Sequence, residues 1–175
     1  HDSNIKLFME KNKTIFLIDG SGFIFRAYYA LPSLTNNDGI PVGAVLGFCN
    51  MMFKLLEEKS SDKIIVIFDS AKKTFRNDLY KEYKSNRGEA PEDLVPQFGL
   101  IRDAVDAFDI TRVELIGYEA DDLIATYSKY FNNEGWNVKI VSSDKDLMQL
   151  VSKNVKMIDP LKNREIGEED VFEKD

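Results

Sequence analysis

Short apolar runs alternate with longer segments along this chain. Three runs are almost purely apolar and rich in branched side chains, as expected for strands buried on both faces: residues 14–18, 63–68 and 138–141. Residues 112–115 and 155–158 are weaker strand candidates. The pattern therefore predicts five strands.

The segments between these runs have the length and the apolar spacing of helices. We expect helices over residues 42–58, 75–84, 91–108, 119–132 and 144–150. Two of them begin at acidic residues, which suit the partial positive charge of a helix N-terminus. Because strands that alternate with helices form βαβ units, we expect an α/β three-layer sandwich around a central, mainly parallel five-stranded sheet.

Length and composition fit one globular domain. The chain has 175 residues, of which 43% are hydrophobic and 30% charged, as in ordinary globular proteins. We expect a single domain over residues 1–175, with residues 1–12 as a flexible end. Because no apolar stretch approaches the roughly 20 residues of a membrane helix and the start lacks the pattern of a signal peptide, we expect a cytoplasmic protein without a membrane partner.

Cysteine and histidine are nearly absent. Cys49 is the only cysteine and His1 the only histidine, which excludes an internal disulfide, a cysteine zinc cluster and Ser-His-Asp chemistry. Gly20 and Gly22 follow a predicted strand, but the motifs of phosphate-binding loops are missing. We therefore expect no nucleotide cofactor, and we expect these glycines to permit a tight turn. Chemistry must rest on carboxylates, lysines and arginines.

Acidic residues follow several of the predicted strands. Asp19 ends the first strand and Asp69 the second, and the carboxyl ends of parallel strands share one edge of a sheet. Acids from four segments are expected at this edge: Asp19, Asp69, Glu119, Asp121, Asp122, Asp144 and Asp146. Each alone is explained as a helix cap or a turn residue. Together they would repel one another unless cations bound between them, and Mg²⁺ or Mn²⁺ suits such oxygen ligands. Two such ions cleave phosphodiester bonds without histidine.

The formal net charge of −7 argues against a nucleic-acid partner, but two divalent cations would bring it to −3. Residues 72–87 are locally basic. If this stretch is helical, one face carries Lys73, Arg76, Tyr80, Lys84 and Arg87, beside an apolar stripe of Phe75, Leu79 and Tyr83. Cations and tyrosines together suit a single nucleic-acid strand, although a solvated amphipathic face explains the stripe when it is taken alone. Arg26 is a further candidate phosphate contact.

The residues that carry these patterns resemble a known family, the amino-terminal 5′-nuclease (5′-3′ exonuclease) domains of bacterial DNA polymerase I. These domains are related to flap endonucleases and have a PIN-like fold. The resemblance covers residues 13–165, and its motifs are LIDGS (17–21), VIFD (66–69), FR (75–76), YKSNR (83–87), PEDL (91–94), GYEADD (117–122) and SDKDL (143–147).

This resemblance implies a 5′-3′ exonuclease and structure-specific flap endonuclease that acts in DNA replication and repair. The seven acids would hold two ions of Mg²⁺ or Mn²⁺, and Asp19 and Asp69 would be catalytic together with Lys84 and Arg87. The scissile strand would be positioned by Arg26, Arg76, Tyr83, Lys84 and Arg87, to which the basic stripe adds Lys73 and Tyr80.

The resemblance also implies the partners. These are DNA with 5′ flaps, nicks or RNA primers, and a polymerase domain in the same full-length chain. Members of the family continue into a helix-hairpin-helix region that grips duplex DNA and supplies two further aspartates. Because the sequence ends at Asp175, before that region, we expect an incomplete second metal site and weaker duplex binding.

Other functions remain open from the sequence. A PIN-type ribonuclease would share the fold and the acids, but would cut single-stranded RNA without a flap junction. A DNA-binding fragment with little activity would bind without metal. Phosphatases with an aspartate nucleophile place a second Asp two residues after the first, whereas position 21 is Ser.

Overall fold

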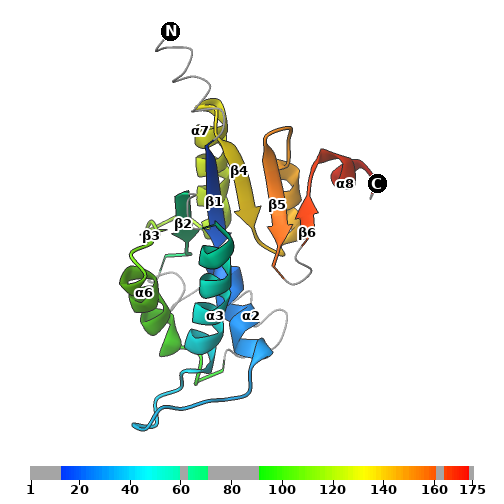
Figure 1. Cartoon of the computed structure of the whole chain (residues 1–175). Coiled ribbons are helices and arrows are strands. Elements are labelled where there is room, and N and C mark those ends of the chain that lie inside the picture. The colour runs from blue at the N-terminus through cyan, green and yellow to red at the C-terminus, as the bar shows by residue number, and fades with distance from the viewer. Residues whose placement is uncertain (1–12, 60–62, 71–90, 161–163, 174–175) are drawn as a thin grey trace.

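The computed structural model describes residues 13–59, 63–70, 91–160 and 164–173 (Figure 1). At its centre is a six-stranded sheet with the strand order β3-β2-β1-β4-β5-β6. The strands are β1 (Thr14–Asp19), β2 (Lys63–Ile67), β3 (Thr111–Val113), β4 (Asn137–Val141), β5 (Val155–Asp159) and β6 (Arg164–Ile166). The neighbouring strands from β3 to β5 pair in parallel, and β6 pairs antiparallel with β5.

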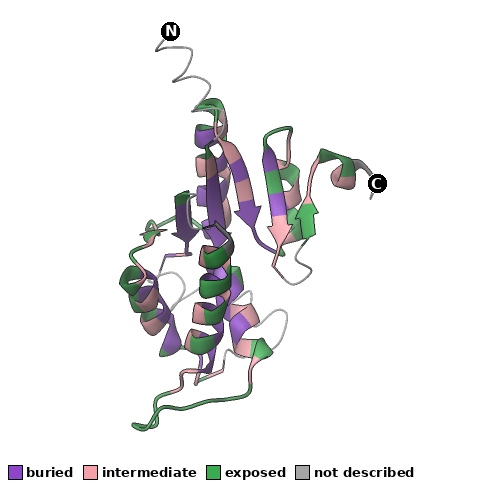
Figure 2. Ribbon diagram, in the orientation of Figure 1, coloured by how far each residue is buried: buried purple, intermediate pink, exposed green. Residues whose placement is uncertain are grey.

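Both faces of the sheet are covered by helices. In β1, Ile15 and Leu17 face one hydrophobic core, and Phe16 and Ile18 face the other, because successive side chains of a strand alternate. The strands β1, β2 and β4 are therefore buried along most of their length (Figure 2). The core around Phe16 includes residues of α2 (Gly20–Ala30), α3 (Gly43–Lys59) and α6 (Gln97–Ala107). The opposite core includes residues of α7 (Ala120–Asn133) and the 3₁₀ helix η1 (Lys145–Leu150). The expected α/β three-layer sandwich is confirmed.

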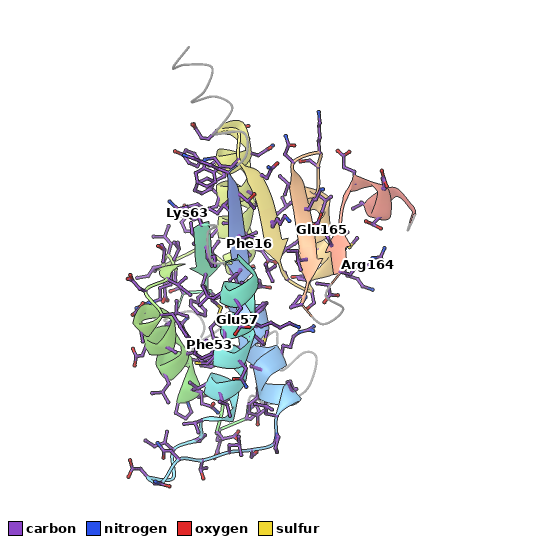
Figure 3. The ribbon with its side chains drawn as sticks, in the orientation of Figure 1. Phe16, Phe53, Glu57, Lys63, Arg164 and Glu165 are labelled. Atoms are coloured by element: carbon purple, nitrogen blue, oxygen red, sulfur yellow. The ribbon has the colours of Figure 1, made fainter. Side chains whose placement is uncertain are left out.

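The strand count that we expected was too low, because the described residues form six strands instead of five. The additional strand, β6, is short and polar, so it has no apolar run that would identify it. Its Glu165, labelled in Figure 3, forms ion pairs with Lys139 of β4 and Lys156 of β5, at 3.2 and 3.3 Å. The strand β6 is held on the sheet by its antiparallel pairing with β5, and its charged side chains suit the edge of a sheet. The helix α8 (Glu168–Glu173) follows it.

The helices differ from the expected ones in several places, and α8 was not expected at all. Residues 91–96 form turns before α6, because the proline at position 96 disfavours a helical conformation in the residue before it. Residues 145–150 form a 3₁₀ helix rather than an α-helix. The helix α2 was not expected as a separate element. The helix predicted over residues 75–84 and the flexible end over residues 1–12 lie outside the described residues.

The first strand continues into α2 without a loop. Asp19 is the N-cap of α2, and its Oδ1 accepts a hydrogen bond from the backbone N of Gly22 at 3.1 Å. A Cβ at Gly20 would lie 2.6 Å from Cε1 of Phe68. Gly20 therefore allows the helix to approach the strand β2 closely, rather than permitting the tight turn that the sequence suggested. The close packing fixes Asp19 at the carboxyl end of β1.

Among the described residues, no helix combines the length and the apolar character that a membrane span requires.

Candidate functional site

The carboxyl ends of β2, β1 and β4 lie next to one another. Asp19, the last residue of β1, is in register with Ile67 at the end of β2. On its other side, Ile18 is in register with Val141 at the end of β4. This edge of a parallel sheet is where α/β proteins place their functional side chains.

Asp19 is buried, with only 7% of its surface exposed. Its Oδ1 accepts a hydrogen bond from Gly22 N at 3.1 Å, and its Oδ2 accepts one from Ser142 Oγ at 2.8 Å. Burial raises the pKa of Asp19 to about 6, and the negative charges of Asp69 and Asp144 add to this increase, while the two hydrogen bonds oppose it. The carboxyl group is therefore held in place but is costly to ionise.

Asp69 is connected to three helices. Its Oδ1 accepts a hydrogen bond from Ala120 N at 2.7 Å, in the first turn of α7. Its backbone N donates to Ser21 Oγ in α2 at 3.0 Å, and its carbonyl oxygen accepts from Nη2 of Arg102 in α6 at 3.1 Å. These bonds fix the residue at the carboxyl end of β2.

Arg102 is a buried residue that sequence reasoning missed. Its Nε donates to Glu114 Oε1 at 2.8 Å and its Nη1 to the carbonyl oxygen of Phe98 at 3.1 Å, and its guanidinium lies 4.5 Å from the ring centre of Phe68. The side chain is thus paired and stacked while it supports Asp69. The one signal in the sequence is its position within the apolar spacing of α6, between Ile101 and Val105.

Asp121 and Asp144 complete a group of coupled carboxylates. The pKa of Asp121 is raised to about 7, first by burial, then by the charges of Asp19, Asp144 and Asp69, and by a hydrogen bond between its carboxyl group and that of Asp144. Asp144 is the N-cap of η1, where its Oδ1 accepts a hydrogen bond from Asp146 N at 2.9 Å. We call Asp19, Asp69, Asp121 and Asp144 the acidic group.

The other three predicted acids are exposed. Glu119 is the N-cap residue of α7, without a hydrogen bond from its side chain to the helix. Asp122 lies in the first turn of the same helix and Asp146 in the first turn of η1. They extend into solvent from the segments that carry Asp121 and Asp144.

The donor set of the acidic group fits a hard divalent cation. Within the described ranges, no three acidic, histidine or cysteine side chains form a complete metal site as they stand. Burial is the main cause of the raised pKa values of Asp19 and Asp121, and the carboxylates are close enough for their mutual repulsion to add to it. A cation bound among them would relieve this repulsion, and Mg²⁺ and Mn²⁺ prefer such oxygen ligands.

Arg26 lies on α2, beside the segment that follows β4. Its Nη2 donates a hydrogen bond to Ser143 Oγ at 2.7 Å, whereas its Nη1 is buried without a hydrogen-bond partner among the described residues. Burial lowers the pKa of the guanidinium, and the charge of Asp159 opposes this decrease. The bond to Ser143 thus anchors the guanidinium of Arg26 beside the segment that follows β4.

The remaining predicted substrate contacts lie outside the described residues and stay a prediction. They are Lys73, Arg76, Tyr80, Tyr83, Lys84 and Arg87.

Two buried serines near the acidic group were also missed by sequence reasoning. Ser21 accepts the hydrogen bond from Asp69 N, and Ser142 donates to Asp19. Serine is common in turns and helix caps, so neither residue has a signal in the sequence that separates it from other serines.

Comparisons with known proteins agree with this geometry. The family described as 5′-3′ exonuclease, N-terminal resolvase-like domain matches residues 14–175. The chain is 55% identical over 174 residues to DNA polymerase I of Rhizobium leguminosarum, covering 95% of the chain and 17% of the polymerase. It is 41% identical over 162 residues to a 5′-3′ exonuclease of Aquifex aeolicus, covering 93% of the chain and 56% of the exonuclease. The chain therefore spans less than two thirds of the length of these relatives.

A solved structure shares the fold. A flap endonuclease of bacteriophage T5, in a complex with DNA and metal ions, superposes with a TM-score of 0.66 at 18% identity, over 93% of this chain and 60% of that one. At this identity the likeness concerns the fold alone, and it confirms the fold class expected from the sequence.

Proposed function

Since this chain belongs to the family of 5′-3′ exonuclease N-terminal domains, we propose that it hydrolyses phosphodiester bonds of DNA with divalent metal ions. The proposed activity is that of a 5′-3′ exonuclease and structure-specific flap endonuclease. Its substrates are DNA with 5′ flaps or nicks, and RNA primers, in replication and repair. The 5′-3′ exonuclease of Aquifex aeolicus supports the reaction, and the T5 flap endonuclease that shares this fold was solved with DNA and metal ions, which is consistent with the proposed substrate class and cofactor.

The observation that carries the proposal is the acidic group. Four carboxylates from four separate segments converge on the carboxyl edge of the sheet, and the pKa values of Asp19 and Asp121 are raised to about 6 and about 7. Perturbed acids of this kind gather at functional sites rather than on ordinary surfaces. Their repulsion is a reason for the folded chain to bind cations.

The proposed cofactor is Mg²⁺ or Mn²⁺, with two ions in the complete enzyme. When bound, such ions polarise phosphoryl oxygens and lower the pKa of water, so that hydrolysis proceeds without histidine. The acidic group supplies carboxylate oxygens from the ends of β1, β2 and β4 and from the start of α7. Glu119, Asp122 and Asp146 supply further oxygens from the exposed side.

The protein's own cations orient the substrate. Ser143 anchors one nitrogen of Arg26, and the guanidinium held in this way suits a phosphate of the scissile strand. Asp19 and Asp69 act at the reacting phosphate, together with Lys84 and Arg87. The other proposed contacts with the scissile strand are Lys73, Arg76, Tyr80 and Tyr83.

The wider setting is also a proposal. The Rhizobium relative is a polymerase of which this chain spans 17%, which supports a polymerase domain in the same full-length protein. Because the proposed substrate is chromosomal DNA, the proposed location of the protein is the bacterial cytoplasm.

The test is cleavage by the wild-type chain of a labelled 5′-flap duplex and of single-stranded RNA, each with Mg²⁺, with Mn²⁺ and with EDTA. We expect the flap duplex to be cut near its junction with either metal and to remain intact in EDTA. Metal-dependent cutting of the RNA but not of the flap would replace the proposal with a ribonuclease. Binding of the flap duplex with no cutting under any condition would reduce the chain to a DNA-binding fragment.

A further inference from the structure

Ser142 lies between two members of the acidic group. It directly follows β4, only 1% of its surface is exposed, and its backbone N donates to the carbonyl oxygen of Ile158 next to it on β5, at 3.1 Å. The side chain therefore starts from a backbone position that the sheet fixes.

The hydroxyl group makes two hydrogen bonds in defined directions. Oγ donates to Asp19 Oδ2 at 2.8 Å and accepts from Asp144 N at 3.0 Å. Because the amide of Asp144 is itself a donor and a hydroxyl has one hydrogen, that hydrogen must point to the carboxylate of Asp19. These two hydrogen bonds therefore fix the orientation of the Ser142 hydroxyl group.

These two bonds relate acids that are far apart in the sequence. Asp19 and Ser142 are 123 positions apart, and the bond between them joins the carboxyl ends of β1 and β4. The bond to Asp144 N holds the N-cap of η1, whose carboxylate in turn accepts from Asp146 N. A single hydroxyl thus fixes the position of the Asp19 carboxylate relative to the segment that carries Asp144 and Asp146.

We propose that Ser142 is a positioning residue for metal binding, whose hydroxyl orients the Asp19 carboxylate and the Asp144 segment toward a shared cation. The proposal rests on the proposed function, since it concerns how the same site is prepared for its metal. Residues that hydrogen-bond to ligating carboxylates fix their orientation, and their loss typically lowers metal affinity or activity about 10-fold to 100-fold.

Substitution of Ser142→Ala removes both hydrogen bonds and adds no volume. Ser128→Ala is the matched control, because Ser128 is equally buried, with 3% of its surface exposed, and lies more than one turn into α7. Ser142→Cys is nearly isosteric and keeps a weak donor, so it tests the same bonds if the alanine variant does not fold.

The experiment measures the Mn²⁺ affinity of the three variants and of the wild type by calorimetric titration, with thermal unfolding in EDTA as a check of the fold. We expect Ser142→Ala to weaken Mn²⁺ binding about 10-fold to 100-fold, Ser142→Cys to weaken it less, and Ser128→Ala to leave it unchanged. The rate of flap cleavage by Ser142→Ala should fall in parallel and recover partly as Mn²⁺ is raised.

Wild-type affinity for Mn²⁺ in both folded Ser142 variants would overturn the proposal, as would an equal loss in Ser128→Ala. These outcomes are distinct from failure of the proposed function, in which the wild-type chain itself would neither bind Mn²⁺ nor cut the flap.

Discussion

Asp121 stands in the first turn of α7, where the helix N-terminus favours a negative charge, yet its pKa is raised to about 7. Burial and the charges of Asp19, Asp144 and Asp69 raise the pKa by more than the helix N-terminus lowers it. Because the pKa is higher in the folded chain than its ordinary value of 3.8, ionisation of Asp121 opposes folding. The stability of the metal-free chain should therefore fall as the pH rises from about 4 to above 7.

We predict that Asp121→Asn stabilises the metal-free chain. At pH 8, the free energy of unfolding should rise by about 1–2 kcal/mol, since one pKa unit corresponds to about 1.4 kcal/mol and partial solvent screening reduces the full amount. At pH 5 the gain should be smaller, because the wild-type carboxyl group is then largely protonated. Urea unfolding of the variant and the wild type in EDTA, at pH 8 and at pH 5, measures the gain in stability at each pH. Identical stabilities of variant and wild type at pH 8 would contradict the raised pKa that burial and the neighbouring carboxylates give Asp121.

A second prediction concerns the buried guanidinium beside Asp69. Arg102→Met should lower the free energy of unfolding by about 2–4 kcal/mol. The substitution removes one of the cations that pair with the partly buried carboxylate of Glu114, and it removes the hydrogen bond to the carbonyl oxygen of Asp69. Arg112→Met is the control, since Arg112 pairs with the same glutamate but has a third of its side chain exposed. Its loss should cost about 1 kcal/mol or less. Equal effects in urea unfolding would refute a special role for Arg102.

Single residues differ in how far the sequence predicts them. Asp19 and Asp69 follow apolar runs, so the position of each at a strand end can be read directly. Ser142 and Arg102 cannot be found in this way, because their importance comes from partners 123 and 33 positions away. Only the folded chain brings those partners together.

At the level of elements, the approach of α2 to β2 depends on a missing side chain. A Cβ at Gly20 would lie 2.6 and 2.7 Å from two ring carbons of Phe68 and 2.9 Å from Cγ1 of Val66. Gly20→Ala should therefore lower the free energy of unfolding by about 1–3 kcal/mol through overpacking. It should also displace Asp19, which caps the same helix, so flap cleavage should fall further than stability alone explains.

Gly99→Ala in α6 is the matched control, because a Cβ at that position would meet no described residue within 4 Å apart from its own neighbours in the helix. Alanine has a higher helix propensity than glycine, so the free energy of unfolding of this variant should rise by up to about 1 kcal/mol. Thermal unfolding of the two variants measures the contrast. If Gly20→Ala proved as stable and as active as Gly99→Ala, the close packing of α2 would not position the site.

Elements were predictable where burial gives a clear pattern. The strands β1, β2 and β4 are buried along most of their length on both faces, so they appear as mostly apolar runs. The antiparallel β6 is short and polar and pairs only with β5, so it gives no such pattern. The helix α2 begins directly at the last residue of β1 and contains two glycines near its start, which suggested a turn instead.

At the scale of the whole molecule, the site exists only because of the strand order. The neighbours β2, β1 and β4 bring together Asp19, Asp69 and the segment of Asp144, which come from distant parts of the sequence. The start of α7 adds Asp121 above the same edge. The parallel arrangement was predictable from alternating strands and helices, whereas the hydrogen bonds that fix each acid were not.

The most direct test of this account is single-turnover cleavage of a labelled 5′-flap duplex in Mg²⁺ by the wild type, Asp69→Asn and Asp103→Asn. The asparagine at position 69 keeps an oxygen for the bond from Ala120 N, so the fold is preserved while a charge of the acidic group is lost. Asp103 is an exposed acid on α6 and controls for the loss of one negative charge. We predict that Asp69→Asn lowers the rate at least about 100-fold, beyond the usual effect of a residue that only supports a metal ligand, and that Asp103→Asn retains the wild-type rate. Wild-type cleavage by folded Asp69→Asn would contradict the assignment of the reaction to this edge of the sheet.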